Sequence, residues 1–294
     1  MRLALVGLGF MGKTHLEAIR GLPGIELVRV VHRADLPQAL HDPGIDAVDL
    51  CLPTDLHAGT AIEALRAGKH VLVEKPMALD APSCDRMIGE AQRRGRILMV
   101  AHVLRFSPAY LALEKALPGH MVRAASFRRR CGRPDWAAWM NDPARTGGGV
   151  FDLLIHDADM ALHLFGPPRA ISATGSGDLI AAQLHYSDGL AIDISGGWYT
   201  PGFPFSMEYA VSTDRATFHY TSQDGVLRVY PEAPFETQPA DGYAAEIAYF
   251  AECVREQKQP SRCPPRESAE AVRLMLALIA ARRWNGEKLA WISE

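Results

Sequence analysis

The sequence predicts two domains: an N-terminal α/β domain on a parallel sheet shortened by one strand, and a C-terminal α+β domain with an open, mainly antiparallel sheet. Apolar segments alternate with helical segments over the first hundred residues, as in parallel-sheet domains. After about Val122 this alternation gives way to strands joined by tight turns. A chain of 294 residues also corresponds to about two domains. We place the domains at 1–119 and 120–294.

The first elements enclose a glycine-rich turn. An apolar strand over 2–6 runs into Gly7, Gly9 and Gly12, and a helical pattern over 13–20 follows. In a strand-to-helix junction, the first glycine permits a tight turn, the second lets a pyrophosphate approach the backbone, and the third lets the helix pack on the strand. The spacing therefore predicts a dinucleotide-binding Rossmann domain, with a turn that serves packing alone as the alternative. Besides the glycines, the residues expected at the cofactor within this turn are Phe10 and Met11.

The second strand, 26–31, ends where such domains often carry an acidic residue for the ribose of NAD. This chain has His32 and Arg33 there instead. A guanidinium can bind a 2′-phosphate in bidentate fashion, so we expect NADP to be preferred over NAD, unless Arg33 is an ordinary surface residue.

Only 14 residues, 32–45, lie between the second strand and the next apolar segment. A crossover helix plus another strand needs more, since a whole βαβ unit takes about 30 residues. We predict that the third strand is missing and that one short helix or loop replaces it. In a sheet of order 3-2-1-4-5-6 this strand lies at the outer edge.

The rest of the first domain alternates strands at 46–53, 70–74 and 96–101 with helices at 54–68 and 81–94. Lys75 comes directly after the strand 70–74, and ligands bind at the carboxyl ends of strands in open α/β sheets. Pro76 keeps Lys75 out of the helical region. On its own, Glu74-Lys75-Pro76 would be read as a charged turn.

The second domain begins its regular pattern with a helix over 147–165, opened by three glycines that would let backbone approach a bulky ligand. Asp152 and His156 are four residues apart on this helix and share a face, where a carboxylate can orient a histidine. A structural hydrogen bond is the alternative. Strands follow over 170–175, 179–186, 190–198, 205–212 and 216–221, then helices over 241–256 and 265–284.

Several segments together resemble the glucose–fructose oxidoreductase and inositol dehydrogenase family (Gfo/Idh/MocA). They are the glycine turn, Ala64-Leu65-Arg66-Ala67-Gly68-Lys69-His70-Val71-Leu72-Val73-Glu74-Lys75-Pro76, Arg105-Phe106-Ser107-Pro108, and the segment from Gly147 to Asp159. The resemblance covers nearly the whole chain. It implies an NAD(P)-dependent oxidoreductase that transfers a hydride between nicotinamide and a carbinol or carbonyl carbon of a sugar, cyclitol or related polyol.

The resemblance also implies roles for single residues. His156 would be the general base, Lys75 would hydrogen-bond the reacting oxygen, and Asp152 would orient His156 or the substrate. The expected cofactor-binding residues are Gly7, Gly9, Phe10, Met11, Gly12, His32, Arg33, Leu52, Pro53, Thr54, His57, Glu74 and Lys75. Substrate contacts are expected from Arg105, Trp139, Asp152 and His156, with a structural ion pair as the alternative for Arg105. Trp136, Tyr243 and His102 are weaker candidates. Packing is the alternative for Trp136 and Trp139.

Composition narrows the function further. The net charge of −3 argues against nucleic acid or an anionic membrane as partner, and no apolar run is long enough to span a bilayer. Five scattered cysteines form no C-x-x-C pair, so we expect no metal site and a reducing, cytoplasmic setting. The cluster Arg128, Arg129 and Arg130, with Arg133 nearby, is interpreted as a solvated strand end, with a site for an acidic ligand or partner as the alternative. We expect a homodimer or homotetramer formed through the C-terminal sheet.

Two alternatives to a sugar or cyclitol dehydrogenase remain. They are a catalytically silent NAD(P)-binding sensor and a reductase of a non-sugar ring or imine.

Overall fold

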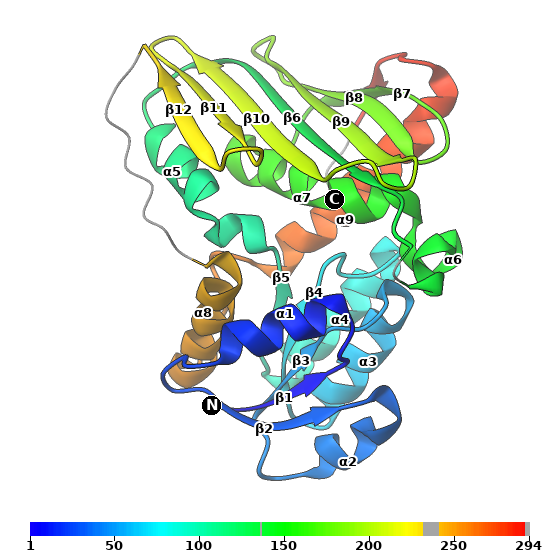
Figure 1. Cartoon of the computed structure of the whole chain (residues 1–294), viewed down its shortest axis with the longest axis vertical. Helices are drawn as coiled ribbons and strands as arrows, with labels where there is room; N and C mark the ends of the chain where they lie inside the picture. The colour runs from blue at the N-terminus through cyan, green and yellow to red at the C-terminus, as the bar shows by residue number, and fades with distance from the viewer. Residues whose placement is uncertain (136, 232–240, 292–294) are drawn as a thin grey trace. The chain divides into compact units, whose positions relative to one another are not determined.

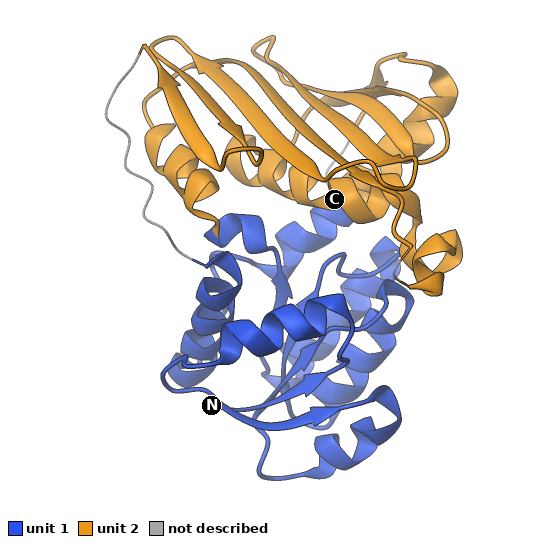
Figure 2. Cartoon of the chain, in the orientation of Figure 1, with its two compact units in different colours: residues 1–106, 240–272 blue, residues 107–239, 273–294 orange. Residues whose placement is uncertain are grey.

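The computed structural model describes residues 1–135, 137–231 and 241–291. The chain forms two compact units that are each discontinuous in sequence, 1–106 with 240–272 and 107–239 with 273–294 (Figure 2). The functional division at residue 119 stays a prediction. The compact units depart from it in two places, because 107–119 belongs to the second unit and 240–272 to the first.

The first unit contains a parallel sheet of five strands in the order β2-β1-β3-β4-β5 (Figure 1). The strands are β1 (Arg2–Val6), β2 (Glu26–Val31), β3 (Ala47–Leu50), β4 (His70–Glu74) and β5 (Leu98–Ala101). Between β2 and β3 the chain forms only the 3₁₀ turn η1 (Arg33–Asp35) and the short helix α2 (Leu36–His41). The prediction of a missing third strand is therefore confirmed, and β2 becomes the edge of the sheet.

Helices cover both faces of this sheet. They are α1 (Phe10–Ile19), α3 (Thr54–Arg66), α4 (Ala81–Arg94) and α8 (Gly242–Glu256). Strand residues Leu3, Ala47, Leu72 and Met99 pack into one apolar cluster with residues of α1 and with Ile247 and Phe250 of α8. A helix from near the end of the chain thus completes the core of the first unit.

The second unit contains an eight-stranded sheet in the order β12-β11-β10-β6-β9-β8-β7-β13. Its strands are β6 (Val122–Gly132), β7 (Ala170–Thr174), β8 (Leu179–His185), β9 (Ala191–Tyr199), β10 (Ser206–Thr213), β11 (Thr217–Thr221), β12 (Val226–Tyr230) and β13 (Leu289–Ala290). Neighbouring strands are antiparallel except for β6 and β9. The predicted open, mainly antiparallel sheet is confirmed.

Helix α7 (Gly148–Phe165) packs across β6, β8 and β9, and α5 (Pro108–Ala116) lies on the same side of the sheet (Figure 1). Shorter helical segments are η2 (Val103–Phe106), η3 (Ala138–Asn141), α6 (Pro143–Thr146) and η4 (Arg282–Trp284), and α9 (Pro265–Ala281) runs through both units.

The interpretation of Arg128, Arg129 and Arg130 as a solvated strand end is wrong for Arg129. Side chains alternate between the faces of a strand, so the middle arginine points toward the helix-covered side. Its guanidinium is buried and forms a bidentate ion pair with Asp157 of α7, at 2.8 and 3.1 Å. Arg128 and Arg130 lie on the other face, near Glu208.

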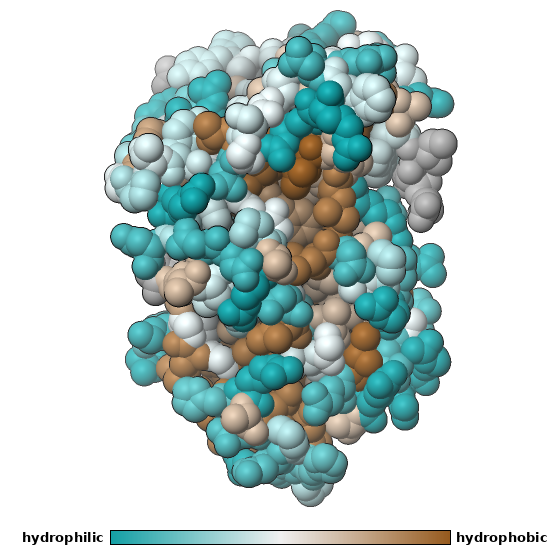
Figure 3. Space-filling view, turned by 90° about the vertical axis from the view of Figure 1, so that its right-hand side faces the viewer, coloured by the Kyte–Doolittle hydropathy of each residue, from teal (hydrophilic) through white to brown (hydrophobic). Residues whose placement is uncertain are grey.

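On the face drawn in Figure 3, hydrophilic residues predominate toward the edges and apolar residues gather near the middle. Among the large apolar side chains that are exposed, Phe10 in the glycine-rich turn reaches 63%. No helix in the described residues has the length and hydropathy of a membrane-spanning segment.

Candidate functional site

The glycine-rich turn links β1 to α1, and its three glycines differ in what surrounds them. Gly7 has a φ of +95°, and a Cβ there would lie 2.4 Å from the carbonyl oxygen of Cys51. A Cβ on Gly12 would lie 2.0 Å from the carbonyl oxygen of Gly7. A Cβ on Gly9 would meet no atom within 4 Å. The chain itself therefore requires glycine at positions 7 and 12, whereas at Gly9 the space is open.

The same turn offers backbone donors. Gly9 is the N-cap of α1 and, as a glycine, has no side chain with which to cap the helix. The first N–H groups of a helix lack intrahelical acceptors and carry partial positive charge, which suits a phosphate. Open space at Gly9, at the N-terminus of α1, fits the pyrophosphate of a dinucleotide. Phe10 and Met11 form the first turn of the helix.

His32 and Arg33 follow the carboxyl end of β2 directly, and both side chains are exposed. Asp35, in the same 3₁₀ turn, is exposed as well. The structure leaves the basic pair accessible but does not choose between the two cofactors.

The segment after β3 holds Leu52, Pro53, Thr54 and His57, and Pro53 precedes the first residue of α3. The His57 ring is buried, with Nε2 at 2.8 Å from the carbonyl oxygen of Leu52 and Nδ1 at 2.7 Å from that of Pro76. Burial lowers the pKa of His57, although both carbonyl contacts oppose the shift. His57 therefore ties this loop to the turn after β4, and its ring nitrogens are engaged by the chain itself.

Lys75 lies where β4 ends, and its side chain is partly exposed. Its backbone N–H donates to Oε2 of Glu74 at 2.9 Å. The Glu74 side chain is buried. Burial acts to raise its pKa, but His15 and neighbouring positive charges outweigh this, so the pKa of Glu74 lies below its usual value. The adjacent strands β1, β3 and β4 thus place the glycine turn, the Leu52–His57 segment and Lys75 together at the carboxyl ends of the strands.

Arg105 is 1% exposed, and its Nη1 donates to the carbonyl oxygen of Arg262 and to Glu267. These are the contacts of the structural ion pair that was the alternative for this residue. A contact with substrate stays a prediction.

Asp152 and His156 are the only residues between Gly149 and Ala161 that are not buried. Since both sit on α7 four residues apart, they share the one accessible stripe of that helix segment, as the spacing predicted. Asp159, one turn further, is 1% exposed. The accessible polar stripe therefore consists of these two side chains.

Protein side chains occupy the space beside two of the three glycines before α7, and the approach of a ligand to this backbone stays a prediction. A Cβ at Gly147 or Gly149 would overlap the rings of Phe151 and Trp198, so protein side chains fill this space. The N–H of Gly149 donates to Asp178 at 2.8 Å, which caps the helix. Close packing at Gly147 and Gly149, and positive φ angles at Gly147 and Gly148, account for glycine at these positions.

Trp139 is partly buried beside Met140, Leu153 and Trp198, and the Arg145 guanidinium lies 5.7 Å from the centre of its ring. Packing, the alternative for this residue, is therefore its observed environment, and substrate contact stays a prediction. Trp136 lies outside the described residues.

Sequence reasoning missed three buried polar residues of the first unit: His15, Asp49 and Glu246. His15 Nδ1 lies 2.8 Å from Asp49, and Nε2 lies 3.0 Å from Glu74 and 3.9 Å from Glu246. An available signal was Asp49 itself, a charged residue within the apolar strand β3. Buried carboxylates are rarely found without partners.

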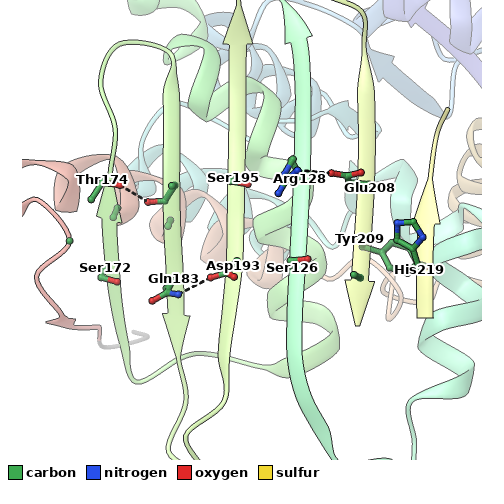
Figure 4. Close-up of a pocket in the computed structure, with 15 residues that line it drawn as sticks. Ser126, Arg128, Ser172, Thr174, Gln183, Asp193, Ser195, Glu208, Tyr209 and His219 are labelled. Atoms are coloured by element: carbon green, nitrogen blue, oxygen red, sulfur yellow. Dashed lines mark hydrogen bonds and ion pairs between the residues drawn. The ribbon is translucent and has the colours of Figure 1, made fainter. Parts of the chain in front are cut away.

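The open face of the eight-stranded sheet carries a hollow of about 540 Å³ (Figure 4). Small polar and charged side chains line it, among them Ser126, Arg128, Gln183, Asp193, Glu208 and His219. None of the predicted catalytic residues is among its lining residues. This hollow is consequently not the site that the sequence motifs predict.

Comparison with known proteins identifies relatives of both regions. The GFO/IDH/MocA oxidoreductase family, described as having an NAD-binding Rossmann fold, matches residues 33–102, and the C-terminal domain of the same family matches residues 119–219. The 4-carboxy-2-hydroxymuconate-6-semialdehyde dehydrogenase of Sphingobium sp. is 27% identical over 89% of this chain and 92% of its own. The NAD⁺-dependent scyllo-inositol 2-dehydrogenase of Bacillus subtilis is 27% identical over 88% of each chain. The solved UDP-N-acetylglucosamine 3-dehydrogenase from Acidithiobacillus ferrooxidans has the same fold, with a TM-score of 0.83, 22% identity and coverage of 96% and 97%.

Proposed function

The chain belongs to the GFO/IDH/MocA family of oxidoreductases, and we propose that it is an NAD(P)-dependent dehydrogenase acting on a CH–OH group of a sugar, cyclitol or related polyol. The observation that carries the proposal is Gly9, since neither its φ nor a neighbouring atom explains why this position is glycine. A ligand that approaches the backbone does explain it. Relatives named as inositol dehydrogenases support the substrate class.

The chemistry assigned to the chain's own residues is polarisation and proton transfer. A bound nicotinamide supplies the hydride acceptor or donor. Lys75 would donate a hydrogen bond to the reacting oxygen and stabilise negative charge that develops there. His156 would take the hydroxyl proton during oxidation, and Asp152, on the same stripe of α7, would orient His156 or the substrate.

The cofactor proposal is a preference for NADP over NAD. It rests on the exposed Arg33 and His32 after β2 and on the absence of a carboxylate at those two positions. Relatives named for each cofactor exist, so relatives alone do not decide. Titrations with NADP and NAD should show NADP binding more tightly, and Arg33→Ala should weaken NADP alone. Tighter binding of NAD to the unmodified protein would contradict this preference.

Turnover is tested by following absorbance of the reduced nicotinamide with a panel of inositols, free sugars and nucleotide sugars. At least one polyol should reduce the cofactor, and Lys75→Met should abolish this while cofactor affinity stays within about threefold. Turnover that survives Lys75→Met with cofactor still bound would remove Lys75 from the mechanism. Cofactor binding without turnover on any substrate would favour a sensor.

We further propose that the protein is a homodimer or homotetramer joined through the open face of the eight-stranded sheet. That face is not covered by α5 or α7, and it presents small and charged side chains around the hollow (Figure 4). Light scattering on the protein and on Ser195→Arg, which places a bulky charge in the hollow, tests this. A variant with unchanged molar mass would exclude this face.

A further inference from the structure

One histidine and three carboxylic side chains are buried together in the first unit, close to the proposed catalytic lysine. His15 comes from α1, Asp49 from β3, Glu74 from β4 and Glu246 from α8, and each is at most 4% exposed. Asp49 and Glu74 lie toward the carboxyl ends of neighbouring strands. Burying such groups costs free energy unless they are paired or neutral, so their arrangement requires an explanation.

His15 lies between two carboxylates. Its Nδ1 is 2.8 Å from Oδ2 of Asp49, and its Nε2 is 3.0 Å from Oε1 of Glu74. The Nδ1–Asp49 contact is a hydrogen bond, whereas the Nε2–Glu74 contact is an ion pair by distance without hydrogen-bond alignment. Only the imidazolium form carries an N–H on both ring nitrogens. Burial acts to lower the pKa of His15, but the two carboxylates raise it well above its ordinary value. His15 is therefore positively charged and holds Glu74 as a carboxylate.

The second oxygen of Glu74 reaches the backbone of the next residue. Oε2 accepts the N–H of Lys75 at 2.9 Å, so a continuous set of contacts runs from Asp49 through His15 and Glu74 to Lys75. One residue later, the carbonyl oxygen of Pro76 is 2.7 Å from His57. The backbone is thus held on both sides of the Lys75 side chain.

Glu246 closes the cluster from α8. Its Oε1 lies 3.9 Å from His15 Nε2, and neither of its oxygens has a hydrogen-bond partner among the described residues. Burial raises the pKa of Glu246 well above its usual value, which favours its neutral form. In its neutral form, Glu246 does not compete with Asp49 and Glu74 for the positive charge of His15.

We propose that His15 is a positioning residue for Lys75, acting through the Glu74 carboxylate on the Lys75 backbone. The inference rests on the proposed function, in which Lys75 meets the reacting oxygen. A displacement of about 1 Å in a catalytic group can cost a hundredfold in rate. Loss of the His15–Glu74 contact should therefore lower kcat while cofactor binding is kept.

Two substitutions separate the contact made by Nδ1 of His15 from the contact made by Nε2. In His15→Asn the amide occupies the place of Nδ1, so it can still contact Asp49 but is too short to reach Glu74. In His15→Gln the amide reaches the place of Nε2, so it can donate to Glu74. We expect His15→Asn to lower kcat by roughly 10- to 100-fold with cofactor Kd changed less than about threefold, and His15→Gln to recover most of kcat. His70→Asn is the matched control, because His70 is also buried in the first unit and instead accepts the Ile97 N–H.

A second measurement does not depend on turnover. Residue-resolved amide hydrogen exchange should show faster exchange at Lys75 in His15→Asn, by about tenfold or more, with β1 and β3 unchanged. His15→Gln and His70→Asn should leave Lys75 as in the unmodified protein. Equal exchange at Lys75 in His15→Asn, or acceleration spread over the whole sheet, would overturn the inference. Because this readout needs no substrate, failure of the proposed activity is recognised separately.

Discussion

Gly9→Ala tests whether glycine in the turn between β1 and α1 is required by a bound ligand, as we propose for Gly9, and not by the packing of the chain itself. A Cβ on Gly9 meets no protein atom within 4 Å, and the residue has φ −69° and ψ −160°, which alanine adopts without strain. Stability should therefore fall by no more than about 1 kcal/mol, the usual cost of placing alanine at an N-cap position. The added methyl group would instead occupy space that a pyrophosphate needs. We expect the Kd for NAD(P) to rise at least tenfold, which corresponds to about 1.4 kcal/mol.

Gly12→Ala is the matched comparison, because its methyl group would lie 2.0 Å from the carbonyl oxygen of Gly7. Ordinary van der Waals contact begins near 3.4 Å, so helix and turn would have to separate by more than 1 Å. Overpacking of this kind costs about 1–3 kcal/mol or more, which outweighs the gain of up to about 1 kcal/mol from replacing glycine in a helix. Gly12→Ala should therefore lose stability as well as cofactor affinity.

The assay combines calorimetric titration of NAD and NADP with urea unfolding of the free proteins. The expected pattern is a selective affinity loss for Gly9→Ala and a combined loss for Gly12→Ala. Cofactor binding by Gly9→Ala as tight as in the unmodified protein would refute the reasoning that the open space at Gly9 belongs to a ligand. A large stability loss in Gly9→Ala would refute it as well, since the structure shows nothing there to displace.

Three further predictions concern the framework of each unit. Burial and the nearby Arg96 lower the pKa of His70 to about 4, so the unfolded chain takes up this proton first and stability falls as pH falls from about 6.5 toward 4. Between pH 7 and pH 5 the loss of stability amounts to about 2 kcal/mol. The variant His70→Asn, whose amide oxygen can still accept the Ile97 N–H, should lack this part of the pH dependence in urea unfolding. Parallel pH profiles of the two proteins would contradict the assignment to His70. Arg129→Met leaves Asp157 buried without its ion-pair partner and should lower the free energy of unfolding in urea by about 3–5 kcal/mol. Adding Asp157→Leu should restore part of this stability, and strictly additive losses in the two single variants would exclude the pairing. Asp80 caps α4 by accepting the Ser83 N–H at 2.7 Å, so Asp80→Ala should lose about 1 kcal/mol by the same measurement while Asp80→Asn loses little, and equal losses would show that the cap is unimportant.

The elements that follow from short-range physics were predictable from the sequence. The apolar runs of β1 and β4 are nearly continuous because an inner parallel strand is buried on both faces. The missing strand followed from chain length alone, since residues 32–45 are too few for a helix and a strand. Local pattern also placed Asp152 and His156 on one stripe of α7, because helical periodicity fixes which residues share a face.

What the sequence did not predict depends on partners distant in the chain. Arg129 looks like part of a basic surface run until Asp157, 28 residues later, is placed beneath it. The close packing of the glycines before α7 depends on Trp198, about fifty residues on, which fills the space beside Gly149. Helix α8 joins the first unit although it follows the strands of the second. Each of these outcomes was decided by tertiary packing, which one-dimensional periodicity does not contain.

Charged residues within otherwise apolar strands carried information that a search for hydrophobic periodicity overlooks. Asp49 lies in the middle of β3, a strand buried along its whole length, and an unpaired carboxylate there would cost more free energy than one strand residue contributes. Its presence therefore requires a buried cationic partner, and His15 of α1 is that partner. The same reasoning applied to Glu74, the last residue of β4, reaches the same histidine from the other side. A polar residue within a buried strand thus points to a specific contact, and Asp49 and Glu74 both point to His15, next to the backbone of Lys75.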